Sequence, residues 1–97
     1  MTRFQIRINI IFKKGTNIEE KIPLLREIAV RNNGVLGKTG TMHWIKATIY
    51  SYAGNPREQI KSILDRINSI EGVYAVLSEV RNLDEWLAGR ERIISNL

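Results

Sequence analysis

The chain contains no cysteine and only one histidine among its 97 residues. The absence of cysteine excludes disulfide bonds, thiolate zinc sites, iron–sulfur clusters and cysteine nucleophiles. His43 alone cannot form a multi-histidine metal site within one subunit, although two copies of it could share a metal across a symmetric dimer. Its position beside Trp44, at the entry to a predicted strand, favours a structural or surface role. We therefore expect no metal site and no cofactor.

Long apolar runs are also missing. The amino-terminal segment 1–14 shows neither the apolar stretch nor the small-residue cleavage site of a signal peptide. No segment approaches the roughly 20 apolar residues that a membrane-spanning helix needs. We expect a soluble, cytoplasmic protein without membrane contact, and the length suits one domain over residues 1–97.

Arrangements of catalytic residues are equally scarce. No pair of carboxylates falls in a recognisable pocket, and the serines have no visible base. The tripeptide 37–39 (Gly-Lys-Thr) resembles the end of a phosphate-binding loop, but position 32 is Asn where that motif requires glycine, and a strand pattern follows instead of a helix. We predict that the protein is not an enzyme and assign no catalytic residue.

What the chain does contain is a regular order of periodic segments. Apolar and polar residues alternate over 4–12, which predicts a strand, and the apolar residues of 60–70 recur at helical spacing. Pro23 removes a backbone donor, so the regular part of the first helix is expected to start near Ile22. The remaining expectations are a stop at 32–34, a short edge-like strand and tight hairpin within 35–46, a strand at 44–50, a helix capped by Asn55, and a strand at 73–80.

This order predicts an α+β fold, a ferredoxin-like βαββαβ sandwich in which a four-stranded antiparallel sheet carries two helices on one face. Residues 83–97 add a C-terminal helical extension that Asp84 can cap. Its apolar residues are expected near one side of that helix, and they are Trp86, Leu87, Ile93, Ile94 and Leu97. Such a segment needs a surface to cover, either its own open sheet face or a second subunit.

Basic residues exceed acidic ones by fifteen to ten, a net charge of +5 that favours encounters with anionic partners. In the predicted sheet, the polar side of the first strand lies beside that of the third, away from the helices. This face interleaves cations with aromatic rings, which is what single-stranded RNA needs for its phosphates and bases. A small basic RNA- or DNA-binding domain is thus an alternative function, and its site residues would be Arg3, Arg7, Trp44, Lys46 and Tyr50. The aromatic signature of an RNA recognition motif is absent from the third strand, and the C-terminal helix or a partner sheet could cover the same face.

Three segments carry a family resemblance, namely 10–17 (IIFKKGTN), 34–37 (GVLG) and 67–76 (INSIEGVYAV). Over residues 4–81 the chain resembles an ACT-type regulatory domain, or a member of the wider ACT-like group of ligand-responsive and metal-responsive regulators. The resemblance implies dimerisation through sheet edges or faces. It also implies a small ligand near the first strand-to-helix turn, against a neighbouring subunit.

The residues of that turn permit an anionic ligand. Free N–H groups at a helix start, together with Lys14 and the Thr16 hydroxyl, favour negative charge, and Gly15 lets the backbone approach closely. The alternative is that Gly15 simply turns the chain and Thr16 caps the helix. Our leading expectation is a non-enzymatic, ACT-like regulatory or small-ligand-binding module that forms a dimer or higher homo-oligomer. Its ligand site would be Lys14, Gly15, Thr16 and Asn17, whereas an assembly protein that uses its C-terminal helix as the interface would bind no ligand.

Overall fold

The computed structural model describes residues 1–89 and 93–96, and its strands form one antiparallel sheet in the order β2-β3-β1-β4-β5. The strands are β1 (Thr2–Phe12), β2 (Gly34–Thr39), β3 (Met42–Ser51), β4 (Val73–Asn82) and β5 (Ile93–Asn96). The helices are α1 (Ile22–Arg31), α2 (Arg57–Asn68) and α3 (Leu83–Leu87), and a 3-10 turn, η1, covers Ile18–Glu20. The predicted ferredoxin-like βαββαβ order is therefore confirmed, with β5 added beside β4.

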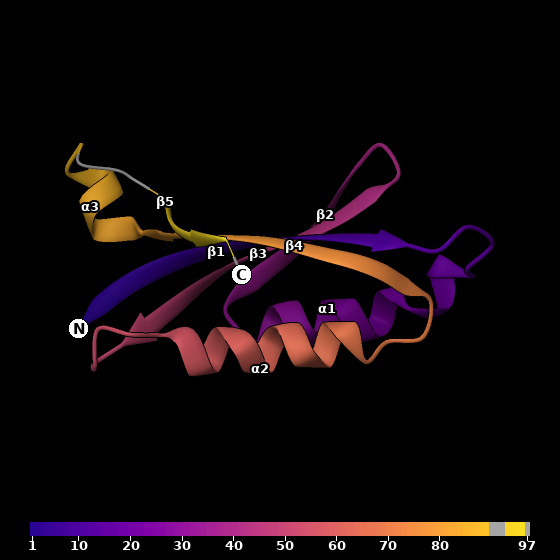
Figure 1. Cartoon of the computed structure of the whole chain (residues 1–97), viewed down its shortest axis with the longest axis horizontal. Helices are drawn as coiled ribbons and strands as arrows, with labels where there is room; N and C mark the ends of the chain where they lie inside the picture. The colour runs from indigo at the N-terminus through magenta and orange to yellow at the C-terminus, as the bar shows by residue number, and fades with distance from the viewer. Residues whose placement is uncertain (90–92, 97) are drawn as a thin grey trace.

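The sheet separates two very different sides of the molecule. Helices α1 and α2 both lie against one face, whereas α3 lies on the other side of the sheet (Figure 1). The covered face holds the core, in which Ile6, Ile8 and Ile10 of the central strand β1 have no exposed surface. Because successive side chains of a strand point to opposite faces, the residues between them form the polar open face. Those residues are Gln5, Arg7 and Asn9.

The start of helix α1 is set by Pro23. As expected, α1 starts at Ile22, with Pro23 in its first turn, and the preceding residues form only the short turn η1. The helix is stopped by Asn33, which adopts a left-handed conformation at φ 55°. Gly34 follows in a tight space, since a Cβ there would lie 2.6 Å from the Lys46 carbonyl oxygen. The stop signal and the start of the second strand are thus both confirmed.

The two later turns also follow their sequences closely. Thr39 pairs with Met42, so a two-residue loop closes the β2–β3 hairpin at Gly40, whose φ is 61°. The side chain of Asn55 accepts a hydrogen bond from the Arg57 N–H at 3.0 Å, although the helix itself is capped one residue later than predicted, at Pro56.

The C-terminal segment differs from its prediction. A helix is present, but α3 covers only five residues, and Ile93 and Ile94 lie in the strand β5, which pairs with β4. Asn82 rather than Asp84 is the cap, because its side-chain oxygen accepts a hydrogen bond from the Glu85 N–H at 3.0 Å. A continuous helical face through residue 97 is therefore wrong, and Leu97 lies outside the described residues.

No helix within residues 1–89 and 93–96 is both long enough and apolar enough to cross a membrane. The cytoplasmic location stays a prediction.

Candidate functional site

The turn after β1 is hydrogen-bonded to Gly72, the residue just before β4. The Lys13 N–H donates to the Gly72 carbonyl oxygen at 2.7 Å, and the Thr16 hydroxyl donates to the same oxygen at 3.4 Å. Gly72 leaves room for this contact, since a Cβ on it would lie 2.5 Å from Thr16 Cγ2. Thr16 is thus a packing residue, and the expectation that it caps a helix is wrong.

No regular helix begins at this turn, so it lacks the row of free backbone N–H groups that would bind an anion. Asn17 precedes only the three-residue turn η1 and makes no side-chain cap bond, and the regular helix begins five residues later. Glu19 and Glu20 are the second and third residues of η1, where their carboxylates would compete with a bound anion. Gly15 does turn the chain, at φ 85°, and Lys14 is exposed beside it. Of the four predicted ligand residues, Thr16 already donates its hydroxyl to the Gly72 carbonyl oxygen and is not free for a ligand.

The open sheet face, in contrast, brings its predicted residues together across three strands. Arg7 of β1 lies opposite Lys46 of β3 on one side and opposite Glu79 of β4 on the other. Two positions earlier in β3, Trp44 lies beside Lys46 on the same face. At the other end of the face, Arg3 lies opposite Tyr50, which is 43% exposed.

Trp44 is held in place on this face by its neighbours on β2. Its ring occupies the space above Gly37, because a Cβ there would fall 2.1 Å from Trp44 Cζ2. Its indole N–H also donates to the Thr39 hydroxyl oxygen at 3.0 Å. The ring is thus fixed both by the missing side chain at Gly37 and by a hydrogen bond at its polar edge.

Two cations accompany this ring. The Arg7 guanidinium carbon lies 5.5 Å and the Lys46 ammonium nitrogen 5.2 Å from the Trp44 ring centroid, both within the range of cation–π attraction. Arg7 also donates from Nε to the Asn9 side-chain oxygen at 3.2 Å. Next to this cluster is a hollow of about 270 Å³. It is lined by Gln5, Arg7, Lys46, Glu79 and Arg81.

The far end of the open face is covered by α3. The Asp84 carboxylate accepts three hydrogen bonds from Arg3, from its backbone N–H at 3.1 Å, its Nε at 2.9 Å and its Nη2 at 2.6 Å. The backbone and side-chain bonds from Arg3 lower the pKa of Asp84. The ring centroid of Trp86, in the same helix, lies 5.4 Å from the Arg81 guanidinium carbon. Of the predicted nucleic-acid residues, Arg3 is therefore already paired, and the C-terminal helix covers one end of the face rather than all of it.

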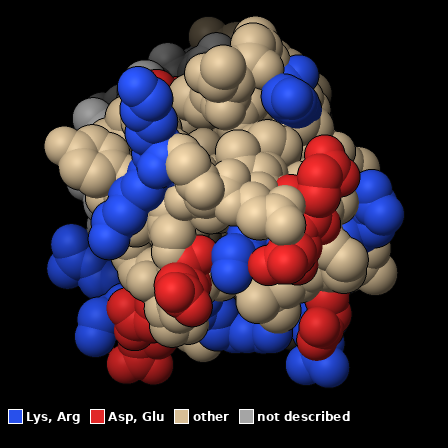
Figure 2. Space-filling view, turned by 90° about the vertical axis from the view of Figure 1, so that its right-hand side faces the viewer, with Lys and Arg blue, Asp and Glu red and all other residues tan. Residues whose placement is uncertain are grey.

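The outer surface of the helices is charged but balanced. Residues 18–31 carry three basic and three acidic side chains, and residues 57–71 carry the same numbers. Figure 2 shows acidic and basic groups interspersed over the lower part of the molecule, where the helices lie. Glu27 is 3.2 Å from Arg31 and 3.8 Å from Arg66, so these charges are partly neutralised by one another.

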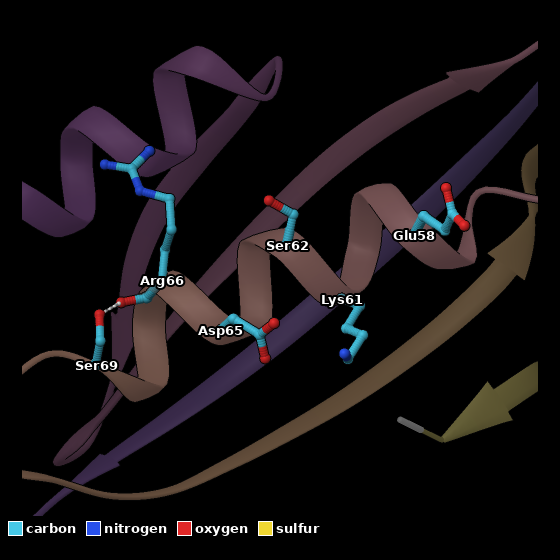
Figure 3. A pocket seen from close by; sticks show the side chains of 6 residues that line it. All are labelled: Glu58, Lys61, Ser62, Asp65, Arg66 and Ser69. Atoms are coloured by element: carbon cyan, nitrogen blue, oxygen red, sulfur yellow. Dashed lines mark hydrogen bonds between the residues drawn. The ribbon is translucent and has the colours of Figure 1, made fainter.

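An open depression runs along α2 on this surface. Figure 3 shows Arg66 extending toward α1, while Lys61 and Asp65 point the other way. Its lining mixes Glu58, Lys61, Asp65 and Arg66 with two serines, and Ser69 donates to the Arg66 carbonyl oxygen at 2.7 Å. Neither charge nor an apolar pocket singles out a ligand here.

His43 lies on the covered side of the sheet, so a surface role is excluded. His43 is 5% exposed, and its ring packs edge-on against Phe12 with the ring centroids 5.9 Å apart. Its Nδ1 has no hydrogen-bond partner among the described residues. Burial and the nearby Lys38 charge lower the pKa of His43, while Glu19 acts in the opposite direction. The histidine is therefore a neutral core residue at neutral pH.

Sequence reasoning missed the contribution of β4 to the open face. Glu79 and Arg81 line the hollow but were not among the expected site residues. Period-two alternation along β4 is the signal that could have found them, since both lie on the opposite side from the buried Ser78 and Val80. Gly37 was also missed, because its function depends on a ring from another strand.

No protein-family model, curated protein or solved structure matches the chain. The resemblance to ACT-type domains therefore stays a prediction that rests on the residues quoted for it.

Proposed function

We propose that this protein is a non-enzymatic binding module that holds single-stranded RNA or DNA on its open sheet face. The observation that carries the proposal is the Trp44 ring, fixed over Gly37 and accompanied by the Arg7 and Lys46 cations. A fixed aromatic ring offers a stacking surface for a base, and adjacent cations attract the phosphates on either side of it.

Charge supports a polyanion rather than a second copy of the same face. The strands place Arg3, Arg7, Lys46 and Arg81 on this face with the carboxylate of Glu79, and Arg3 is paired with Asp84 of α3. Two such faces packed against each other would bring like charges together and remove them from water, which is unfavourable. A nucleic-acid strand instead supplies phosphates for Arg7 and Lys46 and releases its counterions on binding.

The position of the ring favours a single strand over a duplex. Trp44 lies across the sheet surface and is tied to Thr39, so it cannot extend into the groove of a double helix without breaking that hydrogen bond. Bases that are already unpaired can lie on such a ring without an unstacking cost.

The direct test measures fluorescence anisotropy with a labelled oligouridine of about ten nucleotides, a length within the site sizes of single-strand binders. We expect Trp44→Ala to weaken binding by about tenfold or more, as for loss of a stacked base. Lys61→Ala, which removes a cation from α2, is the matched control and should leave affinity nearly unchanged. Absence of binding by the unaltered protein at low salt, or equal losses in both variants, would reject the proposal.

The self-associating, ACT-like ligand-binding module is the second candidate. In its favour, a Cβ at Gly15 would meet nothing within 4 Å, so the backbone of that turn is open beside the exposed Lys14. The edge strand β2 also leaves Val35 60% exposed, where a second copy could pair. With inorganic phosphate as probe, this candidate expects a rise in Tm that Lys14→Ala abolishes and Lys61→Ala retains, together with a dimer mass by light scattering. A monomer whose Tm ignores phosphate would remove it.

A further inference from the structure

Glu79 is an unexpected residue on a face that otherwise suits phosphates. It lies directly opposite Arg7 on the neighbouring strand, which is the usual place for a cross-strand ion pair. The Arg7 guanidinium turns away instead, toward Asn9 at 3.2 Å and toward the Trp44 ring. Within the part of the chain that the structure describes, the Glu79 carboxylate makes no ion pair and no hydrogen bond, although it lines the hollow with Lys46.

A carboxylate in this position weakens phosphate binding unless it accepts hydrogen bonds from the ligand itself. The neutral donors that a nucleic acid brings are the N–H groups of its bases and, in RNA, the ribose 2′-hydroxyl, and only the base N–H groups differ from one base to the next. Guanine presents two parallel donors, N1–H and the N2 amino group, which match the two oxygens of one carboxylate. Cytosine and adenine present an amino group, whereas uracil presents a single N3–H flanked by two carbonyl oxygens that a carboxylate repels.

The rest of the hollow fits the other edge of the same base. Guanine carries acceptors at O6 and N7, and Arg and Lys are the side chains that most commonly donate to them. Arg7 and Lys46 line the hollow together with Glu79, so donors and an acceptor converge on one volume of about 270 Å³. Trp44 next to it supplies the stacking surface.

We infer that Glu79 is the specificity-determining residue of the proposed nucleic-acid site and that it selects guanine in a single strand. This inference rests on the proposed function and adds a base preference to it. The carboxylate accepts the two Watson–Crick donors of guanine, and the neighbouring cations hold its O6 edge and the flanking phosphates.

The experiment compares oligouridines of about ten nucleotides in which one central base is replaced by guanine, inosine, cytosine or adenine. At fixed salt, the unaltered protein should bind the guanine strand about tenfold or more tightly than oligouridine, as expected for one bidentate pair. Inosine, which lacks the N2 amino group, should fall between them.

Glu79→Gln provides the decisive variant. It should remove the preference for guanine while oligouridine binding stays equal or becomes tighter, because a charge that repels phosphates is gone. Glu58→Gln, on the exposed surface of α2, is the matched control and should keep the preference.

Different results would overturn the guanine preference and the nucleic-acid site itself. Equal binding of all five strands, or an unchanged guanine preference in Glu79→Gln, would overturn the role of Glu79 and leave the nucleic-acid site intact. No binding of any strand would overturn both.

Discussion

The two faces of the sheet are built from alternating residues of the same strands, yet they differ in almost every physical property. On β1, Ile8 has no exposed surface and packs beneath the helices, while its neighbour Arg7 lies on the open face beside Trp44. Burial on the covered face supplies stability, since apolar area removed from water is the main driving force of folding. The open face contributes little to that core and is therefore available for binding.

Variants of the two faces should separate binding from folding. A change on the open face should alter binding with a small effect on folding, and a change on the covered face should do the reverse. The outer surface of α2, which is charged but balanced, supplies controls that belong to neither face.

The largest effect is expected from reversing a charge on the open face. Lys46→Glu places a carboxylate beside Trp44 and opposite Arg7, so its repulsion of phosphates should lower nucleic-acid affinity by about 100-fold. Lys61→Glu makes the same reversal on α2 and should change affinity by far less. Titrations at several salt concentrations measure both, and the Lys46 variant should show a shallower salt dependence. Similar losses in the two variants would mean that binding follows net charge rather than this face.

The next effect concerns the glycine beneath the tryptophan. Gly37→Ala introduces a methyl group at about the position of the Trp44 ring, so the ring must leave its place. Overpacking of this kind typically lowers the free energy of unfolding by about 1–3 kcal/mol. Nucleic-acid binding should weaken in parallel, because the stacking surface moves.

A double variant isolates the cause. In a Trp44→Ala background the clash disappears, so adding Gly37→Ala should cost almost nothing in urea unfolding. If Gly37→Ala is equally destabilising with and without the tryptophan ring, the backbone and not the ring is responsible.

The architecture was predictable from local pattern, whereas the site depended on register. Alternation over 4–12 and helical spacing over 60–70 indicate their elements without any tertiary information, and Pro23 indicates where α1 begins. The strand β5 was missed because a short apolar segment fits a helix or a strand equally well, and only pairing with β4 decides between them.

Other features arise from contacts between distant parts of the chain. Arg3 and Asp84 are separated by 81 residues, and no local pattern connects them. The position of Glu79 opposite Arg7 depends on the β1–β4 register, which is shifted by an irregularity at Ile11/Phe12. The cations of β1 and β3 could thus be named from the sequence, and alternation could place Glu79 on the open face, but its position opposite Arg7 could not be predicted.

On the covered face, a smaller effect is expected at Ser78. Its hydroxyl oxygen is buried and has no hydrogen-bond partner among the described residues. Because an unsatisfied buried polar group is costly, Ser78→Ala should raise the free energy of unfolding by about 1 kcal/mol in a urea titration. Ser62→Ala on the exposed side of α2 should change it little, and nucleic-acid affinity should be unaffected by either. A destabilised Ser78→Ala variant would indicate that the hydroxyl has a partner after all.

His43, which is also buried on this face, predicts a pH dependence. The folded-state pKa of His43 lies below its usual value of 6.5, chiefly because burial disfavours the imidazolium. The unfolded chain therefore binds a proton more readily than the folded one, so the stability that His43 contributes is complete above pH 6.5 and is lost as the pH falls toward the folded-state pKa. Denaturant unfolding from about pH 7.5 to about pH 5.5, the range in which an ordinary histidine titrates, measures this loss.

The assignment can be checked cleanly because His43 is the only histidine in the chain. His43→Leu should flatten the dependence between these limits, which lie above the range in which Asp84 titrates, since Arg3 lowers the pKa of that carboxyl below 3.8. The salt dependence of the slope decides whether burial or nearby charge is the cause. A histidine exposed on a cationic face would also have a lowered pKa, but it would lose its slope in high salt, because exposed charges are screened. A slope that persists at high salt places the cause in burial on the covered face, between the sheet and the helices.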